Sequence, residues 1–151
     1  MKTPLRVYAD TSVFGGCFDK EFDEASRAFF DQVTSGRFLL IVSDLTIREL
    51  EGAPPPIREF FSGLQGYESV AATSECYLLR DAYLQALVLG LASADDALHV
   101  AIATIHKADI VVSWNFKHIV QRRRIHGFEA VNTLMEYRSP EIFSPREIVE
   151  S

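Results

Sequence analysis

Short apolar runs alternate with amphipathic segments along most of the chain, and polar, glycine or proline residues separate them. The apolar runs predict five strands, at residues 6–10, 38–42, 67–72, 110–113 and 128–132. Helices are predicted at residues 24–35, between Ser43 and Gly52, and at residues 57–64, 74–89 and 94–107. Strands that alternate with helices and have apolar interiors predict an α/β fold, specifically a three-layer α/β/α sandwich around a central, mainly parallel sheet of about five strands.

Small and polar residues mark the boundaries of these elements. Gly36 and Gly90 are placed to end helices, and the three prolines at 54–56 separate two of them. Thr11 and Ser12, followed by a Gly-Gly pair, predict a turn directly after the first strand. The chain has no internal repeat or low-complexity linker, so we expect a single domain over residues 1–151.

Length and composition are those of an ordinary globular domain. With 151 residues the chain can bury about two thirds of its unfolded surface, and 48% hydrophobic with 24% charged residues is typical. The apolar runs are too short to cross a bilayer, and the N-terminus lacks the apolar core of a signal peptide. We therefore expect a cytoplasmic protein without membrane contacts. Cys17 and Cys76 lack zinc-ligand spacing, which favours buried, reduced thiols.

Charge is distributed unevenly along the chain. Residues 117–126 contain four cations, Lys117, Arg122, Arg123 and Arg124, and no acid. The net charge of the whole chain is −6 and that of this segment is +4, so the remaining residues have a net charge of −10. The segment can face the phosphates of RNA, or it can be the solvated basic start of a helix, and its charge alone leaves both interpretations open.

Acidic residues stand at the ends of predicted strands or in the helices that follow them. Asp10 ends the first strand, and Glu49 lies six residues after Ser43, within two turns of the second strand. In an open parallel sheet, ligands bind beyond the carboxyl ends of the strands. Each acid also has a structural alternative, because Asp10 can cap a turn and Glu49 can be a solvated helix residue.

The predicted helix at residues 94–107 begins with two further acids. Ser93 as N-cap makes Asp96 the third helical residue of an arrangement like a capping box, and acids in a first turn suit the helix dipole. Asp96 nevertheless shares an apolar helix face with Val100, whereas Asp95 points more outward. We therefore favour Asp96 over Asp95 as a ligand.

Gathered acids imply a cation. Two carboxylates about 4 Å apart repel by roughly 4 kcal/mol at an effective dielectric constant near 20, and a divalent ion removes that repulsion. Oxygen ligands favour Mg²⁺ or Mn²⁺ over zinc, and such an ion can activate water and stabilise charge on a phosphate. The residues therefore indicate metal-assisted phosphodiester hydrolysis, with Asp10, Glu49 and Asp96 as metal ligands.

The segments VYADTSVF, SDLTIRELEG, ADDALHVAIA and SWNFKHI, in this order and spacing, resemble the motifs of PIN-domain nucleases over nearly the whole chain. The resemblance implies that Asp10, Glu49 and Asp96 are metal-binding catalytic acids and that the cofactor is Mg²⁺ or Mn²⁺. It also implies an endoribonuclease that cleaves single-stranded or structured RNA. Many similar bacterial proteins are toxins held inactive by a small antitoxin, and many are dimers, so an antitoxin and a homodimer are expected partners.

The last motif departs from the family pattern, which often has a fourth acid there. Asn115 and His118 stand in its place, so Asn115 is a catalytic candidate without charge and the number of metal ions stays open. His118, Thr11 and Ser12 are candidates for contacting phosphate, with structural roles as the alternative. Trp114 is expected to pack rather than to stack on a base. The missing acid also keeps a second hypothesis open, a catalytically weak PIN-like module that binds RNA or protein.

Overall fold

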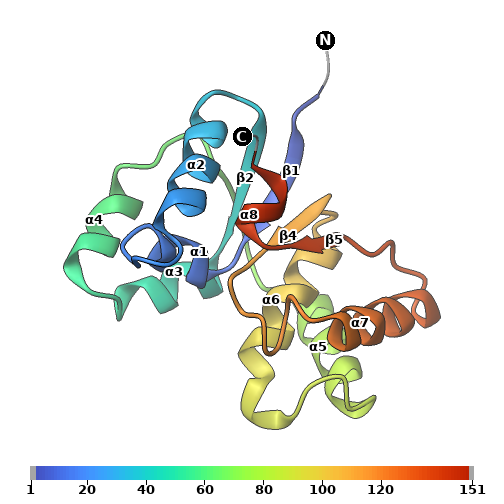
Figure 1. Cartoon of the computed structure of the whole chain (residues 1–151). Helices are drawn as coiled ribbons and strands as arrows, with labels where there is room; N and C mark the ends of the chain where they lie inside the picture. Colours follow the sequence, from blue (N-terminus) through green and yellow to red (C-terminus); the bar gives the residue numbers. More distant parts are fainter. Residues whose placement is uncertain (1–2, 150–151) are drawn as a thin grey trace.

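A five-stranded, fully parallel sheet forms the middle of the molecule in the computed structural model, which describes residues 3–149 (Figure 1). Its spatial order is β3-β2-β1-β4-β5. The strands are β1 (Leu5–Ala9), β2 (Phe38–Ser43), β3 (Glu68–Val70), β4 (Ile110–Val112) and β5 (Glu141–Phe143). The predicted α/β architecture is therefore confirmed, and the sheet is entirely rather than mainly parallel.

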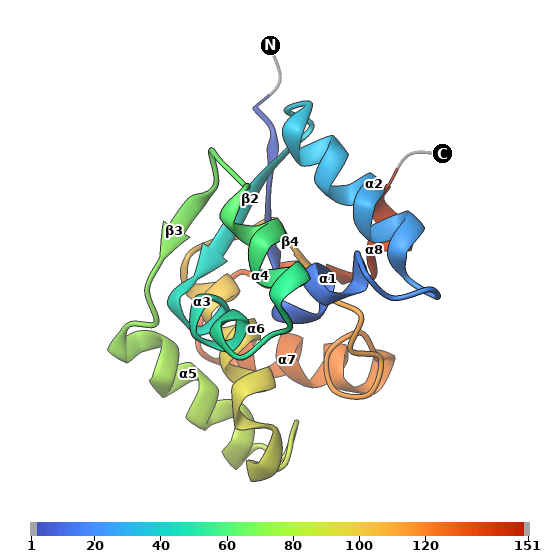
Figure 2. The same cartoon turned by 90° about the vertical axis from the view of Figure 1, so that its left-hand side faces the viewer.

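Helices cover both faces of this sheet, as the two views in Figures 1 and 2 show. The helices are α1 (Thr11–Gly16), α2 (Asp23–Thr34), α3 (Asp44–Glu51), α4 (Pro55–Ser62), α5 (Ser74–Gln85), the 3₁₀ turn η1 (Leu91–Ser93), α6 (Ala94–Ile105), α7 (Arg122–Leu134) and α8 (Pro145–Ile148). No helix within residues 3–149 is long and apolar enough to span a membrane.

Each face of the sheet has its own hydrophobic core, because successive strand residues point to opposite sides. Tyr8 and Val111 pack with the buried residues of α5, α6 and α7. Val7 and Val112, their neighbours along the same strands, pack with α1, α2 and α8 and with the partly buried residues of α4. These two cores cover β1 and β4 on both faces, and the carboxyl ends of these two strands carry the site described below.

The prediction of a fifth strand at residues 128–132 is wrong, because these residues lie inside α7. Phe128 and Val131 are buried three positions apart, which is helical spacing, and the Gln121 side chain caps the helix by accepting a hydrogen bond from the Arg124 amide. The observed fifth strand, Glu141–Phe143, has only three residues, too few for a period-two pattern to stand out.

The turn predicted after the first strand is also wrong, because residues 11–16 form helix α1. Its two glycines made the segment resemble a turn, but Gly16 serves close packing. A Cβ atom there would lie 2.7 Å from Nε1 of Trp114 and would also clash with the Ser26 hydroxyl. Helix α5 ends at Gln85 rather than at residue 89, because Leu87 takes a positive φ of 60° and turns the chain toward α6.

Other expectations about the core hold. Cys17 and Cys76 are buried and free of disulfides, as predicted. The aromatic residues of α2 and α4 also pack against each other, with the Phe30 and Phe60 ring centroids 4.9 Å apart. These rings therefore belong to the core between α2 and α4.

Candidate active site

The candidate site lies where the direction of strand order reverses in the sheet. The chain builds β1, β2 and β3 outward on one side and then returns to place β4 on the other side of β1. Asp10 follows β1 and Ser113 follows β4, and the Asp10 amide donates to the carbonyl of Val112 at 3.2 Å. Such a switch point leaves a crevice beyond the strand ends, where α/β proteins bind ligands.

Asp10 is buried, with 4% of its surface exposed, and hydroxyl groups from two segments hold its carboxylate. Ser12 donates to Oδ1 at 2.5 Å and Ser113 donates to Oδ2 at 2.8 Å. The carboxylate makes no capping hydrogen bond to α1, so the turn-capping alternative does not describe it. Burial raises the pKa of Asp10, and the charge of Asp96 raises it further, against the opposing effect of His99 and the two hydroxyls.

Asp96 occupies the first turn of α6 and faces the loop after β4. Its Oδ2 lies 3.0 Å from Nδ1 of His118. The Ser93 side chain makes no capping hydrogen bond to α6, so the predicted capping box is not formed. Asp95 is exposed. Asp96 is thus the less exposed of the two acids, as helical periodicity predicts, and its position brings its charge within electrostatic range of Asp10.

Glu49 ends a buried chain of hydrogen bonds that the sequence did not reveal. Its Oε1 lies 2.6 Å from Nε2 of His99, and Nδ1 of His99 lies 2.6 Å from the Tyr8 hydroxyl, which in turn lies 2.8 Å from Oγ of Ser43. Thr11 also donates to Oε1 of Glu49, at 2.6 Å. Partial burial alone would raise the pKa of Glu49, but the hydrogen bond and charge of His99, with help from Thr11, hold it below its usual value.

The Tyr8–His99–Glu49 chain therefore fixes Glu49 and compensates its charge. His99 is 2% exposed and lies three residues after Asp96 on the same helix, so one helix supplies both an acid and the partner of another acid. The only hint in the sequence is a histidine within the otherwise apolar segment ALHVAIA.

The other polar candidates bind protein groups in this structure. The hydroxyls of Thr11 and Ser12 are directed at Glu49 and Asp10. Oδ1 of Asn115 accepts the backbone amides of Lys117 and His118, at 3.2 and 2.9 Å, and so shapes the loop after β4. Thr11 and Ser12 thus hold the acids in place, and Asn115 holds the loop that carries His118.

The four basic candidates divide into two groups. Lys117, Arg122 and Arg123 are exposed, and their side chains make no hydrogen bond or ion pair within the described part of the chain. Arg124 instead donates from Nη1 to the carbonyl of Val88 at 2.6 Å, so it joins α7 to the segment after α5. Three of the four cations are therefore available to an anionic ligand.

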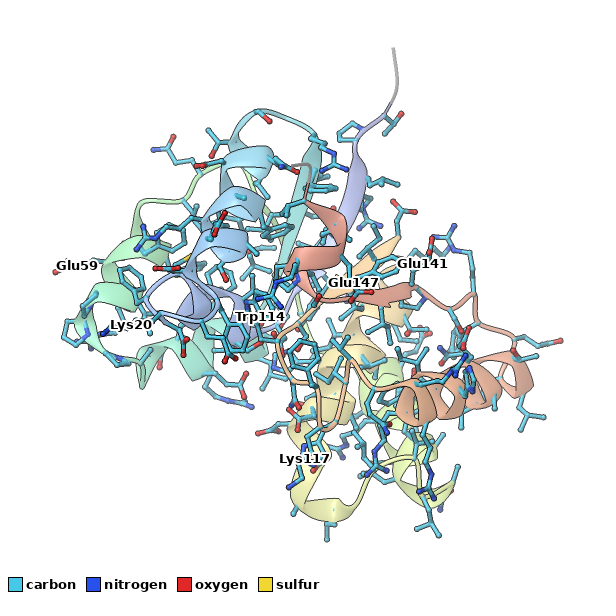
Figure 3. The ribbon with its side chains drawn as sticks, in the orientation of Figure 1. Lys20, Glu59, Trp114, Lys117, Glu141 and Glu147 are labelled. Carbon is cyan, nitrogen blue, oxygen red and sulfur yellow. The ribbon has the colours of Figure 1, made fainter. Side chains whose placement is uncertain are left out.

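Trp114 packs as the sequence predicts. One ring face stacks on Phe22 with centroids 4.2 Å apart, Arg146 lies over the ring at 5.4 Å, and Nε1 donates to Ser26. In Figure 3 Trp114 lies near the centre of the molecule beside α8, whereas Lys117 lies lower, on the loop after β4. Trp114 therefore supports the loop after β4 and leaves no open ring face for a base.

Solved structures share this architecture. One is the complex VapBC2 from Rickettsia felis bound to a DNA fragment from their promoter, with 12% identity, a TM-score of 0.59, and coverage of 93% of this chain and 98% of that one. Another is FitAcB from Neisseria gonorrhoeae, with 14% identity, a TM-score of 0.60, and coverage of 94% and 99%. FitAB bound to an IR36 DNA fragment gives 15% identity, a TM-score of 0.55, and coverage of 92% and 94%.

The chain has a PIN-like fold. No protein-family model and no curated protein matches the sequence. Identities of 12–15% establish the fold, and the chemistry of the PIN-like site has to be argued from its own residues.

The acids of this PIN-like site fit a hydrated divalent ion better than a closed cage. Among residues 3–149, no three His, Cys, Asp or Glu side chains are grouped so that they could hold a metal ion by themselves. Mg²⁺ keeps several water ligands and commonly uses one or two carboxylates plus substrate phosphate oxygens. Asp10 and Asp96 offer two carboxylates, and the raised pKa of buried Asp10 means that a neighbouring cation would stabilise its charged form.

Proposed function

We propose that this protein is an endoribonuclease that depends on Mg²⁺ or Mn²⁺ and hydrolyses phosphodiester bonds at the crevice beside Asp10 and Asp96. The proposal rests mainly on one observation: Asp10 is a buried carboxylate at the end of β1 that makes no capping hydrogen bond to α1, and the first turn of α6 brings a second carboxylate, Asp96, within electrostatic range of it. Repulsion between two such acids would be relieved by a cation bound between them, which is why we propose a metal at this place.

Each residue of the site has a proposed role in this chemistry. Asp10 and Asp96 would hold the ion, which when bound would lower the pKa of water and offset charge on the phosphate. Glu49 is held by His99, which also compensates its charge. It would therefore orient water or substrate rather than bind the ion directly. His118, whose Nδ1 lies 3.0 Å from Oδ2 of Asp96, would hold that carboxylate in position.

The substrate would approach over the basic loop. Exposed Lys117, Arg122 and Arg123 follow the site directly in the chain and would contact RNA phosphates, while the net charge of −6 disfavours indiscriminate binding elsewhere. The role of Thr11 and Ser12 would be to position Glu49 and Asp10, and that of Asn115 to shape the loop after β4. Arg124 would position α7.

We further propose that the protein is the toxin of a toxin–antitoxin pair, bound by a small antitoxin. Support comes from the fold alone, since the structures it matches are the complexes VapBC2 and FitAB, each with DNA in one of the solved forms. Co-expression with the product of an adjacent small reading frame tests this role. Relief of growth inhibition and co-purification would support it, and neither effect with any neighbouring gene product would count against it.

Cleavage of a generic single-stranded RNA by the purified protein tests the enzymatic proposal. We expect cleavage with Mn²⁺, none with EDTA, and none from Asp96→Asn, while Asp95→Asn, which changes the exposed neighbour, retains cleavage. The competing hypothesis, a PIN-like module that binds RNA or protein without cutting, is favoured by the lack of a three-acid group within residues 3–149. RNA binding that ignores EDTA, with no cleavage under any metal, would establish that module instead.

A further inference from the structure

Phe116 is an exposed aromatic residue directly beside the candidate site. It is 47% exposed, and it stands between Asn115 and Lys117 in the loop after β4. Single exposed apolar side chains are common on protein surfaces, so the position of this ring beside the site, and not its exposure alone, calls for an explanation.

The ring is exposed but held in place. Its edge packs against Trp114, with centroids 6.0 Å apart and planes at 66°, and it also meets Phe22 at 6.5 Å. Trp114 in turn is stacked on Phe22 and hydrogen-bonded to Ser26, so the support behind Phe116 is rigid. A ring fixed in this way can receive a flat ligand without the entropy cost of ordering a mobile side chain.

Two hollows meet at this loop. The first, of about 480 Å³, is lined by residues that include Ser12, Trp114 and Asn115, and Ser12 bonds directly to Asp10. The second, of about 410 Å³, has Phe116 in its wall and lies between α7 and the segment β5–α8. Asn115 of the first hollow and Phe116 of the second are consecutive residues, so an RNA strand that runs from one hollow to the other would pass Phe116.

The charges around the second hollow indicate how a nucleotide would lie in it. Arg122 lines the hollow, and exposed Lys117 neighbours Phe116 in the chain. Glu129 and Glu147 line the hollow as well. Two carboxylates inside would repel a phosphate, so the phosphates belong on the side of Lys117 and Arg122, and a neutral base belongs in the hollow.

We propose that Phe116 is a stacking platform for one unpaired RNA base next to the bond that is cut, and that the hollow between α7 and β5–α8 receives this base. The inference rests on the proposed function for the position of the cut. An aromatic ring flanked by unpaired cations is the usual way in which proteins hold single-stranded nucleic acid. A base in an A-form duplex is already stacked on its neighbours, so the site takes single strands and rejects duplexes.

Fluorescence of 2-aminopurine tests the stacking, because this base is quenched when it stacks on an aromatic ring. Single-stranded RNA octamers with 2-aminopurine at successive positions are titrated with the Asp96→Asn protein in EDTA, where no cleavage occurs. We expect quenching at one position. Phe116→Leu should abolish it and weaken binding roughly 5- to 150-fold, which corresponds to about 1–3 kcal/mol of base–aromatic stacking. Phe116→Trp should restore both.

Tyr77→Leu is the matched control. Tyr77 is an exposed aromatic on α5, 37% exposed with Arg80 over its ring at 4.8 Å, and it lies away from the loop after β4. It should change neither quenching nor affinity, and all variants should melt near the parent temperature. The same octamer paired with its complement should not be quenched.

Three results would overturn the proposal: unchanged affinity and quenching in Phe116→Leu, no quenching at any position in the parent, or equal quenching of duplex and single strand. If Phe116→Leu instead abolished binding of a protein partner and left RNA unaffected, the ring would be a protein contact. Mn²⁺-dependent cleavage by the wild-type protein is measured separately. Stacking without cleavage would overturn the proposed nuclease activity and leave the stacking role of Phe116 intact. Cleavage without stacking would support the nuclease activity and overturn the stacking role.

Discussion

Replacement of Asp10 by asparagine should stabilise the metal-free protein at neutral pH. Asp10 is buried, and burial together with the charge of Asp96 raises its pKa above the ordinary value. A carboxyl group whose pKa is higher in the native state than in the unfolded state does not destabilise the native state at a pH below its unfolded pKa, near 3.9. The destabilisation grows as the pH rises toward the raised native pKa and stays constant above it. Asp10→Asn removes the charge and therefore the destabilisation.

The size of the effect follows from the linkage between pKa and stability. Each unit by which the native pKa exceeds the unfolded pKa lowers the free energy of unfolding by about 1.4 kcal/mol above the native pKa. For a chain of 151 residues this corresponds to roughly 3–6 °C in Tm. The side-chain amide oxygen of the new asparagine can still accept a hydrogen bond from one of the two serine hydroxyls. The other hydroxyl must turn so that it accepts a hydrogen bond from the amide nitrogen. This rearrangement lowers the free energy of unfolding by at most about one neutral hydrogen bond, 0.5–1.5 kcal/mol.

Thermal melts in EDTA between pH 4 and pH 8 measure this effect. We expect Asp10→Asn and the wild type to melt together near pH 4 and to separate as the pH rises, with the variant more stable at pH 7.5 by about 3–6 °C for each unit by which the native pKa is raised. Asp95→Asn, at an exposed carboxylate, is the matched control and should show no such separation. A variant that melts below the wild type at pH 7.5, by a margin that does not change with pH, would refute the argument and make Asp10 a stabilising structural residue.

Three further predictions concern His99 and the basic residues. His99→Ala removes a buried donor from Glu49, so the unfolding free energy should fall by about 1–3 kcal/mol in denaturant titrations, and an unchanged midpoint would exclude the compensating role. Combined Arg122→Ala and Arg123→Ala should reduce the slope of log affinity for single-stranded RNA against log salt by about 1.4, because two phosphate contacts are lost. Arg124→Ala should instead leave that slope unchanged and lower Tm, because the Arg124 guanidinium donates to the Val88 carbonyl. A smaller slope with an unchanged Tm would show that Arg124 contacts the RNA.

The sequence predicted where the strands that carry Asp10 and Ser113 end, because the relevant signals are local. An apolar run followed by a polar residue marks a strand end, and Asp10 and Ser113 are both found at such ends, on adjacent strands. Asp96 was favoured over Asp95 by helical periodicity, which also depends only on near neighbours. Parallel topology then brings these ends to one edge of the sheet.

The features that the sequence did not reveal depend on distant partners. His99 meets Tyr8 and Glu49, which are 91 and 50 positions away, so no local pattern distinguishes it from a packed core histidine. The same applies to Arg124, whose partner is the carbonyl of Val88. The misplaced fifth strand has a different cause. Over only five residues, the apolar positions in 128–132 fit the period of a strand as well as that of a helix. In the structure these residues belong to α7, which Gln121 caps.

Calorimetric titration with Mn²⁺ tests the central claim, that the carboxylates of Asp10 and Asp96 form the metal site. We expect the wild type to bind Mn²⁺ with one equivalent per chain, because Glu49 is compensated by His99 and Asn115 carries no charge. Binding should be lost in the double variant Asp10→Asn, Asp96→Asn, and retained in Asp95→Asn. An Mn²⁺ affinity in the double variant equal to that of the wild type would contradict the account.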